Sequence, residues 1–516
     1  MLRSILSLIL ITLSTSSEAD TLYVPNDHKT IQTAIDAAKA GDTILVFAGT
    51  YNERIQLKPG IVVRSFGNNT HGAIGIKRAE VTIIDGGGKA GEEPGVLMAE
   101  GSSLDGFSIT RIGLFDQAVW KKHFDSQGEE LGDDEGAVQA EGTIPAVSIH
   151  GLTCTVLNNI VHHNGDVGIA ITGSEGERKV PLVADNVSYR NLGGGIGVAD
   201  LAQPIIRGNS CYENLRAGIG CRNSNPIILG NKCFNNIRAG IGCREGARPI
   251  VRENECYRNR RAGIGIRTKR TAPVVENNEC YENEMAGIGN RDGAEPTIRN
   301  NQCFKNKMAG IGSDGSRSLI VGNECRENLM AGIGLTGKAK ATLQNNKCIE
   351  NKLVAVGVTQ GSTATICGNH FSRTGGMPPI IAVRDGSTAT IQNNVIQGGG
   401  VAAVLVQGNV RLNDNIFVGT GAKQGNAVWA WEGSSVIVSD NAFDGYRAAV
   451  NASKSTMIVT GNTIERFQRT AIIVKDSQRP AHVYGNKATT VDPQAKVVDV
   501  QGPSGVVESN KLLNGA

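Results

Sequence analysis

The sequence predicts an all-β protein coiled as a single-stranded parallel β-helix. The motif Asn-x-Cys-x-x-Asn recurs seven times between Asn209 and Gly357, and Gly-Ile-Gly follows it in successive units. Successive cysteines lie 22 to 24 residues apart, a period too short for a domain and typical of one turn of a solenoid. Each unit alternates short apolar runs with breaks rich in Asn, Gly and charged residues. Within the repeats, no stretch of ten residues shows a helical period.

The composition favours strands with tight corners. The recurring apolar residues are Ile, Val, Cys and Ala, which excludes a leucine-rich repeat, and 66 of the 516 residues are glycine. Glycine and asparagine tolerate the left-handed backbone that corners require. We therefore expect about three short strands per coil and a rise of about 4.8 Å per coil. The net charge of +3 is too small to indicate a nucleic-acid partner.

The first residues predict export. Arg3 precedes an apolar run, and small residues follow at 17–19, so 1–19 is predicted to be a signal peptide. No other segment reaches 18 apolar residues, and no membrane span is expected. We expect a single domain over 20–516 and a periplasmic or extracellular location.

A short helix is expected to cap the open end of the solenoid. The segment 29–40 places Ile31, Ala34, Ile35 and Ala38 on one helical face, and Gly41 follows where a helix would end. The first strands are expected directly after it. The most regular coils are predicted over 209–357.

The segment TIQTAIDAAKAGDTILVFAGTYNERIQLKPGIVV resembles the amino-terminal part of many exported right-handed parallel β-helix proteins. That superfamily includes pectate lyases, polygalacturonases, pectin methylesterases and alginate epimerases. The later Asn and Gly-Ile repeats resemble its coils, including those of the periplasmic protein that assists nitrous oxide reductase maturation. The resemblance implies a right-handed coil and an exported, often carbohydrate-directed role, but one scaffold carries many chemistries.

Enzyme signatures of that superfamily are missing, since the chain has neither Gly-His-Gly nor Asp-Pro-His-Asp. Two segments remain as candidate catalytic sites. The irregular insertion 114–142 interrupts the coils and also carries an acidic run at 133–135, and long loops on a rigid scaffold often carry function. The second segment is 162–166, where imidazoles and a carboxylate are close in sequence. The candidate catalytic residues are Lys121, Lys122, His123, Asp125, His163 and Asp166.

The repeated strand Arg-Ala-Gly-Ile-Gly-Cys-Arg predicts a binding surface. Two-residue alternation places Ala217, Ile219 and Cys221 in the core, and leaves an outer face of glycine bordered by arginine. Stacked coils convert this pattern into a glycine floor between two arginine rows. Arginine forks pair carboxylate or sulfate with two donors, so the surface suits an extended acidic polysaccharide. The predicted ligand-binding residues are Arg216, Arg222, Arg238, Arg244, Arg261, Arg267, Arg291, Gly218, Gly240 and Gly263.

Other interpretations of this surface stay open. Neighbouring carboxylates can balance the arginines, and a terminal segment or another subunit can pack on the glycines. Farther along, Met285, Met308 and Met330 replace the first arginine row. Stacked thioethers could bind Cu(I), although such a row more often packs under a loop or partner. No other cofactor is expected.

The seven repeated cysteines are predicted to form a column of buried thiols, with disulfides between adjacent coils as the alternative. The two repeated asparagines are predicted to form structural ladders. The sequence therefore favours an exported protein that binds, or also processes, an acidic polysaccharide. The alternatives are a polysaccharide lyase or hydrolase with its site near 114–142, and a non-enzymatic periplasmic factor for copper-enzyme maturation. The oligomeric state stays open.

Overall fold

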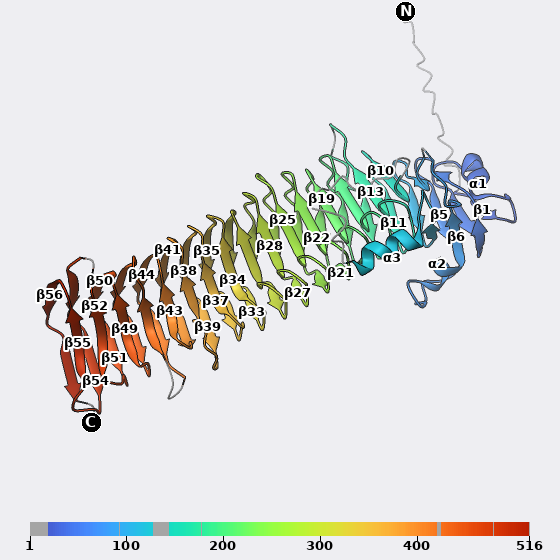
Figure 1. Ribbon diagram of the computed structural model, residues 1–516. Coiled ribbons are helices and arrows are strands. Elements are labelled where there is room, and N and C mark those ends of the chain that lie inside the picture. Colours follow the sequence, from blue (N-terminus) through green and yellow to red (C-terminus); the bar gives the residue numbers. More distant parts are fainter. Residues whose placement is uncertain are drawn as a thin grey trace, which may run out of the picture.

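The computed structural model describes residues 19–91, 93–126, 144–176, 178–420, 425–477 and 479–514. Over these residues the chain forms an elongated solenoid with very little helix (Figure 1). Each regular coil contributes one strand to each of three parallel sheets, which we name A, B and C in the order in which a coil enters them. The predicted all-β solenoid is confirmed.

The coils that carry the candidate site have short strands in direct register. In sheet A they are β11 (Thr155–Leu157), β14 (Leu182–Ala184), β17 (Ile205–Arg207), β20 (Ile227–Leu229), β23 (Ile250–Arg252), β26 (Val274–Glu276) and β29 (Thr297–Arg299). In sheet B they are β12 (Ile160–His162), β15 (Val187–Tyr189), β18 (Ser210–Tyr212), β21 (Lys232–Phe234), β24 (Glu255–Tyr257), β27 (Glu279–Tyr281), β30 (Gln302–Phe304) and β33 (Glu324–Arg326). In sheet C they are β10 (Val147–His150), β13 (Ile169–Thr172), β16 (Ile196–Ala199), β19 (Ile219–Arg222), β22 (Ile241–Arg244), β25 (Ile264–Arg267), β28 (Ile288–Arg291), β31 (Ile311–Asp314) and β34 (Ala331–Thr336).

The core lies inside the three sheets and is built of columns. Ile228 in sheet A, Cys233 in sheet B and Ile241 in sheet C are each fully buried in one coil. Cys211 pairs with Cys233, and Cys233 with Cys256, in the strand register. The seven repeated thiols are all unbridged and buried. Burial raises the pKa values of the Cys233 and Cys280 thiols well above the usual range of a cysteine. The cysteines therefore act as small apolar filling.

Asparagine ladders hold the corners. At the A–B corner, the Asn209 Nδ2 donates to Asn231 Oδ1 at 2.9 Å, and at the B–C corner the Asn236 Nδ2 donates to Asn259 Oδ1 at 3.1 Å. Asn236 Nδ2 also donates to the Cys211 carbonyl at 2.9 Å. Each buried amide therefore satisfies polar groups of the neighbouring coil, which keeps successive coils in register.

The amino-terminal end is capped as the sequence predicts. Helix α1 (Ile31–Ala37) begins after Thr30, whose hydroxyl accepts from the Thr33 backbone N–H. Its apolar face is buried against β1 (Thr21–Val24) and β2 (Thr43–Val46). The helix is shorter than the predicted 29–40, and a strand that the sequence reading did not identify precedes it.

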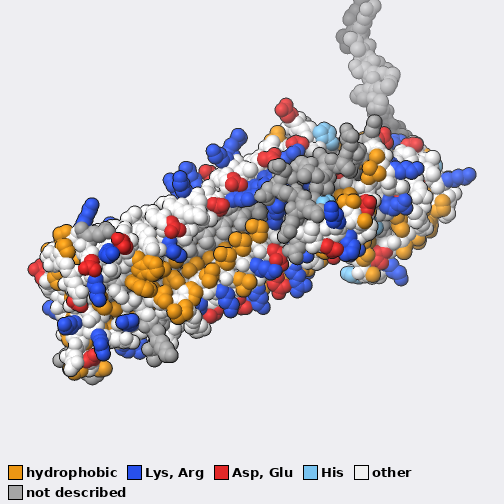
Figure 2. Space-filling view, viewed as in Figure 1, with side chains coloured by type: hydrophobic (Ala, Val, Ile, Leu, Met, Phe, Trp, Pro, Cys, Tyr) orange, Lys and Arg blue, Asp and Glu red, His pale blue; other side chains and the backbone are white. Residues whose placement is uncertain are grey.

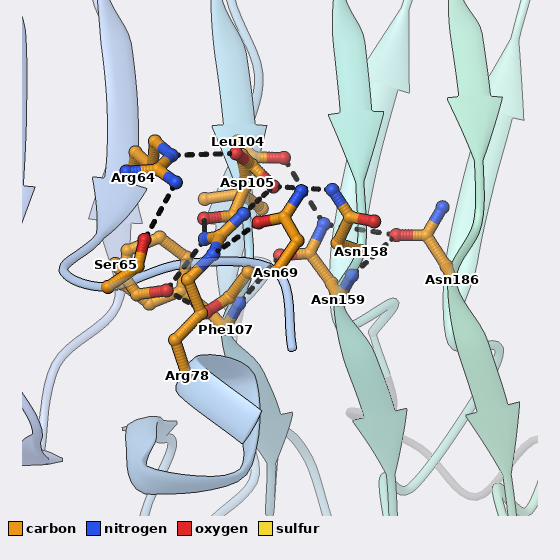
Figure 3. Close-up of polar contacts among 12 residues, drawn as sticks. Arg64, Ser65, Asn69, Arg78, Leu104, Asp105, Phe107, Asn158, Asn159 and Asn186 are labelled. Carbon is orange, nitrogen blue, oxygen red and sulfur yellow. Dashed lines mark hydrogen bonds and ion pairs between the residues drawn. The ribbon is translucent and has the colours of Figure 1, made fainter. Parts of the chain in front are cut away.

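A second helix, α2 (Lys77–Val81), is fixed to the first coils by a buried guanidinium (Figure 3). Arg78 is 3% exposed. Its Nη2 contacts Asp105 Oδ1 at 2.5 Å, and its Nη1 donates to Ser65 Oγ at 2.8 Å. A Cβ on Gly106 would lie 1.8 Å from Arg78 Nη1, so this position accepts only glycine.

Within the parts of the chain that the structure describes, no helix has the length and apolar character needed to cross a membrane. The predicted signal peptide, apart from its last residue, lies outside the described residues. The carboxy-terminal coils end in β55 (Lys496–Gln501), β56 (Ser504–Glu508) and β57 (Lys511–Asn514).

Candidate functional site

The outer edge of sheet C carries an arginine row, as the sequence predicts. Arg222 pairs with Arg244 and Arg267 pairs with Arg291 in the strand register. Cys243 pairs with Ile266, so Arg244 and Arg267 are also adjacent. We name these four residues the strand-end row. It lies where each sheet C strand turns toward sheet A, and it is continued by Asp314.

A second arginine row follows the B–C corner. Backbone hydrogen bonds run from Arg238 N to the Arg216 carbonyl at 3.4 Å and from Arg261 N to the Arg238 carbonyl at 3.3 Å. These three residues, the corner row, are half-buried. The two rows border the outer face of sheet C along three successive coils, because Arg216 and Arg222 belong to one coil and the next two coils repeat them.

The floor between the rows differs from the predicted one. Gly218 points inward, since a Cβ there would meet the Gly240 carbonyl oxygen at 2.8 Å and Asn236 Nδ2 at 2.9 Å. Gly240 and Gly263 have the same surroundings. Two-residue alternation holds only within an extended strand, and the backbone still bends at Gly218, one residue before β19 begins.

Alanine and another glycine column form the outer floor instead. A Cβ on Gly220 would meet no atom within 4 Å, so this glycine opens outward. A Cβ on Gly242 would lie 3.8 Å from the Ala217 Cβ, and one on Gly265 would lie 3.3 Å from the Ala239 Cβ. The alanines therefore lie beside the outward-facing glycines; Ala217 is half-buried and Ala239 and Ala262 are 9% and 8% exposed, so the floor is smooth.

Carboxylates border the strand-end row on its outer side. Arg222 lies 3.8 Å from an Asp200 oxygen and 3.9 Å from a Glu245 oxygen, and Arg291 lies 3.4 Å from an Asp292 oxygen. All of these side chains are 44–59% exposed. Exposed pairs at such distances contribute at most about 1 kcal/mol each, so the carboxylates reduce the repulsion within the row without enclosing it.

The corner row changes from arginine to methionine along the solenoid. Met285 N donates to the Arg261 carbonyl, and Met308 N and Met330 N donate to the methionine before them at 3.2 and 3.1 Å. The three side chains are 43%, 40% and 43% exposed. An apolar stripe therefore continues the basic one. Figure 2 shows apolar side chains, in orange, gathered on the visible face of the solenoid. No group of three or more His, Cys, Asp or Glu suited to a metal ion occurs among the residues described.

Helix α3 (Gln117–Asp125) brings the predicted insertion to the corner row. Trp120 packs against Leu192, Leu215 and Ile237, which follow the ladder asparagines of three successive coils. Its indole Nε1 donates to the Glu213 carbonyl at 3.0 Å. Leu215 directly precedes Arg216, so α3 lies along the side of the solenoid next to the first arginines (Figure 1). The acidic run at 133–135 lies outside the described residues.

The candidate residues on α3 differ in their surroundings. Lys121 and Asp125 form an exposed ion pair at 2.5 Å, with side chains 65% and 58% exposed. Lys122 is exposed. His123 is half-buried, and among the described residues no hydrogen-bond partner is found for its buried Nδ1.

The adjacent histidines lie on the other side of the corner. His162 Nδ1 and His163 Nδ1 are 2.7 Å apart, so one of them donates and the other accepts. Burial lowers the pKa of His162 to about 4, and the neighbouring imidazole adds to the shift. Burial, together with Arg190, also lowers the pKa of His163. These rings are therefore neutral at neutral pH.

Asp166 lies near Arg216 of the corner row. Among the described residues, no hydrogen bond joins it to His163. Burial raises the pKa of the Asp166 carboxyl, and the nearby Arg216 guanidinium opposes that shift. The structure thus places one candidate catalytic residue near one predicted binding residue.

The sequence reading missed an aromatic ladder on the outer face of sheet B. Consecutive rings lie 4.8 to 5.1 Å apart, nearly parallel except for the more tilted first pair. The ladder consists of His162, Tyr189, Tyr212, Phe234, Tyr257, Tyr281 and Phe304. Arg326 covers its last ring at 4.0 Å. The signal was present, because an aromatic residue follows five consecutive repeat cysteines. Ring faces inside the ladder are occupied by neighbours, which favours a structural role.

Several solved structures are similar to this chain. One is the A-module of the Azotobacter vinelandii mannuronan C-5 epimerase AlgE6, with 15% identity and a TM-score of 0.31. The match covers 92% of this chain and 95% of that one. The periplasmic alginate epimerase AlgG has 14% identity and a TM-score of 0.36, and the match covers 77% of this chain and 83% of that one. The PL6 family alginate lyase AlyGC has 10% identity and a TM-score of 0.32, and the match covers 96% of this chain and 100% of that one. Likeness at this level assigns no activity.

No curated protein matches the chain significantly. The family model of the right-handed beta helix region matches residues 178–324, 309–443 and 379–515. The matched segments overlap and together extend over more than half of the 516 residues. The chain therefore belongs to the right-handed beta helix family, as its resemblance to that superfamily predicts.

Proposed function

We propose that this protein is exported and binds an extended acidic polysaccharide along the outer face of sheet C. The observation that carries the proposal is the pair of arginine rows on the two borders of an alanine and glycine floor. A ligand lying on this floor meets a guanidinium on either side in each of three successive coils.

The spacing of the rows suits a polymer better than a small anion. Coils rise by about 4.8 Å, so each row repeats a positive charge at that interval. A chain that carries a carboxylate or sulfate on each sugar repeats its charge in the same way along its length. Arginine pairs such groups with two parallel donors, and the small floor side chains allow the backbone of sheet C to be approached closely.

Stability alone gives a poorer account of these rows. Like charges in directly opposed positions of neighbouring strands are destabilising, and alternation with carboxylates within the row would have removed the cost. The chain places Asp200 and Glu245 beside the row instead, at distances of 3.8 and 3.9 Å from Arg222. These separations exceed a hydrogen bond, and Arg222 can turn its fork toward a ligand.

The proposal is tested with a quadruple variant, Arg238→Ser, Arg244→Ser, Arg261→Ser and Arg267→Ser. We expect an unchanged fold by circular dichroism, and a loss of at least about tenfold in affinity for acidic polysaccharides. Wild-type binding should weaken with salt, because exposed charges are screened. The matched control removes four cations from the outer face of sheet A, namely Arg207, Arg317, Lys340 and Arg411. Equal retention of both variants on an acidic-glycan panel would refute the proposal.

A second candidate function is cleavage of the bound chain beside the corner row. Asp166 favours it, since burial raises the pKa of a carboxyl that lies near Arg216, and a raised pKa suits a carboxyl to general-acid catalysis. Cleavage predicts new reducing ends or unsaturated uronates during incubation with the polymer. Both products should disappear in Asp166→Asn while binding persists. Binding without products assigns the protein to recognition alone.

A further inference from the structure

A pocket opens at the head of the strand-end row. It has a volume of about 330 Å³ and lies at the corner between sheets C and A, across four successive coils. Gly151, Thr172, Gln203 and Asn225 represent those four coils in its lining. Because coils are about 4.8 Å apart, the pocket extends along the axis of the solenoid, parallel to the arginine rows.

An unusually long corner creates this pocket. The connection from β13 to β14 comprises nine residues, 173–181, whereas the connections from β10 to β11 and from β19 to β20 comprise four, 151–154 and 223–226. Gly173 allows the longer corner to leave the coil tightly, because a Cβ there would meet the Asp200 carbonyl oxygen at 2.4 Å. Residues of this corner, including Ser174, Arg178 and Lys179, then form one wall.

The strand register connects the pocket to the strand-end row. Thr172 pairs with Ala199, and Val198 pairs with Cys221, which places Ala199 beside Arg222. Thr172 therefore belongs to the column that becomes Arg222 and Arg244 in later coils. A ligand that follows the strand-end row toward the amino terminus reaches the pocket without leaving this edge of sheet C.

The lining suits a sugar acid. Arg178 and Lys179 supply positive charge, Thr172, Gln203 and Asn225 supply hydroxyl and amide groups, and Leu152, Leu201 and Pro181 supply apolar contact. Glu175 is the acidic member of the lining. A concave site with apolar walls and a few convergent polar groups is typical of small-molecule recognition. The carboxylate of a pyranose would pair with Arg178 while its C–H groups contact the leucines, since Lys179 already forms an ion pair with Glu100 at 3.4 Å.

The rim of the pocket also carries backbone strain. Asp200 and Leu201 are both left-handed, with φ of 52° and 67°. Leucine rarely adopts this conformation, because it brings the Cβ too close to the following carbonyl oxygen. Leu201 is nevertheless 50% exposed, and its N–H donates to the Asn223 carbonyl at 2.7 Å. Left-handed residues recur at this corner in later coils, at Asn223, Glu245 and Asp292, so the conformation belongs to the corner, and it leaves the exposed Leu201 side chain in the lining of the pocket.

We infer that this pocket is a subsite for one hexuronate residue, at the end of the polymer track that starts on the strand-end row. The inference rests on the proposed function for the track, but the pocket has its own ligand chemistry. Occupation by a single residue would fix the position of the polymer along the sheet, which a uniform row of arginines cannot do.

The test uses monomeric hexuronates, namely glucuronate, galacturonate, mannuronate and guluronate, added to the full chain and followed by ligand-observed NMR. We expect at least one to bind, and to lose at least about tenfold in affinity in Arg178→Ser and in Gln203→Ala. Arg317→Ser and Arg411→Ser, both on the exposed face of sheet A and outside the pocket, should leave monomer binding unchanged. The corresponding neutral hexoses should bind at least about tenfold more weakly.

The inference is overturned if no hexuronate binds, if neutral hexoses bind equally well, or if the pocket variants bind like the wild type. Acidic-polymer retention is measured separately on the same variants. Polymer binding that depends on the arginine rows, together with an inert pocket, would remove the subsite and leave the proposed function intact. Monomer binding at the pocket without polymer retention would remove the proposed track and leave a sugar-acid site.

Discussion

The Trp120 indole N–H donates to the Glu213 carbonyl oxygen at 3.0 Å, and this bond joins residues that are 93 positions apart in the chain. It ties the inserted helix α3 to the coil that also supplies Leu215, the second of the three coils on which the Trp120 ring packs. Glu213 itself accepts from Arg190 Nε at 2.6 Å, and the Arg190 guanidinium lies 4.9 Å from the Trp120 ring centroid. Helix, corner and ion pair therefore form one local unit.

Trp120→Ala should release α3 from the solenoid. The side chain is 5% exposed and contacts Leu192, Leu215 and Ile237, so we expect a loss of about 3–5 kcal/mol of local packing. Hydrogen exchange should accelerate across 114–126 while the regular coils keep their protection. Val119→Ala, on the 39% exposed side of the same helix, is the control. Unchanged exchange in Trp120→Ala would contradict the docking that the structure shows.

Arg78→Met should destabilise the first coils strongly. It removes the guanidinium that contacts Asp105 and Ser65 and leaves a carboxylate whose side chain is 14% exposed. Breaking a buried pair in this way costs about 3–5 kcal/mol. Arg64 also pairs with Asp105 but is 33% exposed, and Arg64→Met should cost about 1 kcal/mol or less. Thermal unfolding of the two variants distinguishes the contributions, and equal melting temperatures would argue against the network in Figure 3.

His162 predicts a pH dependence of stability. Burial lowers its pKa from 6.5 to about 4, so between these values the unfolded chain binds more protons than the folded one. The contribution of His162 to the free energy of unfolding is fully present above pH 6.5. It is lost as the pH falls toward 4, by about 3 kcal/mol at most. His162→Tyr should keep the stacking on Tyr189 and flatten the denaturation midpoint over this range. His71→Gln, at an exposed position, should retain the wild-type slope.

The methionine stripe allows a direct test of the copper alternative. Thioether ligands select Cu(I), and the three side chains are 40–43% exposed on adjacent coils. A copper role predicts Cu(I) binding in competition with a chelator, lost when Met285, Met308 and Met330 are all changed to leucine. Met377→Leu, at a 72% exposed methionine outside the row, should bind as the wild type does. Equal Cu(I) binding by the triple variant would assign the stripe to apolar contact.

The regular repeat made the coil and its register predictable. Because Cys211 and Cys233 occupy equivalent places in identical units, each must lie over the other if the units stack, and the strand register pairs them. The same argument predicted that Arg222 would pair with Arg244. The capping helix was predictable because Ile31, Ala34 and Ile35 have a helical spacing, and all three are buried.

Features that depend on how a coil bends were harder to predict from the sequence. Strand alternation extended to Gly218 predicts an outward glycine, whereas the bend before β19 turns it inward. The aromatic ladder could have been found from the residue that follows each repeat cysteine. The pocket beside Thr172 could not have been found, since the sequence of 173–181 shows only that the corner is long.

The sequence by itself determined the solenoid, its period and the columns of like residues, because each of these follows from local periodicity and from the need to bury an apolar face in every coil. Only the tertiary structure decided which columns face solvent at the bends, where α3 docks, and that Asp166 lies near Arg216. The physical reason is that these relations depend on corner geometry and on contacts between distant segments, such as Trp120 with Leu215, and no repeated spacing encodes them.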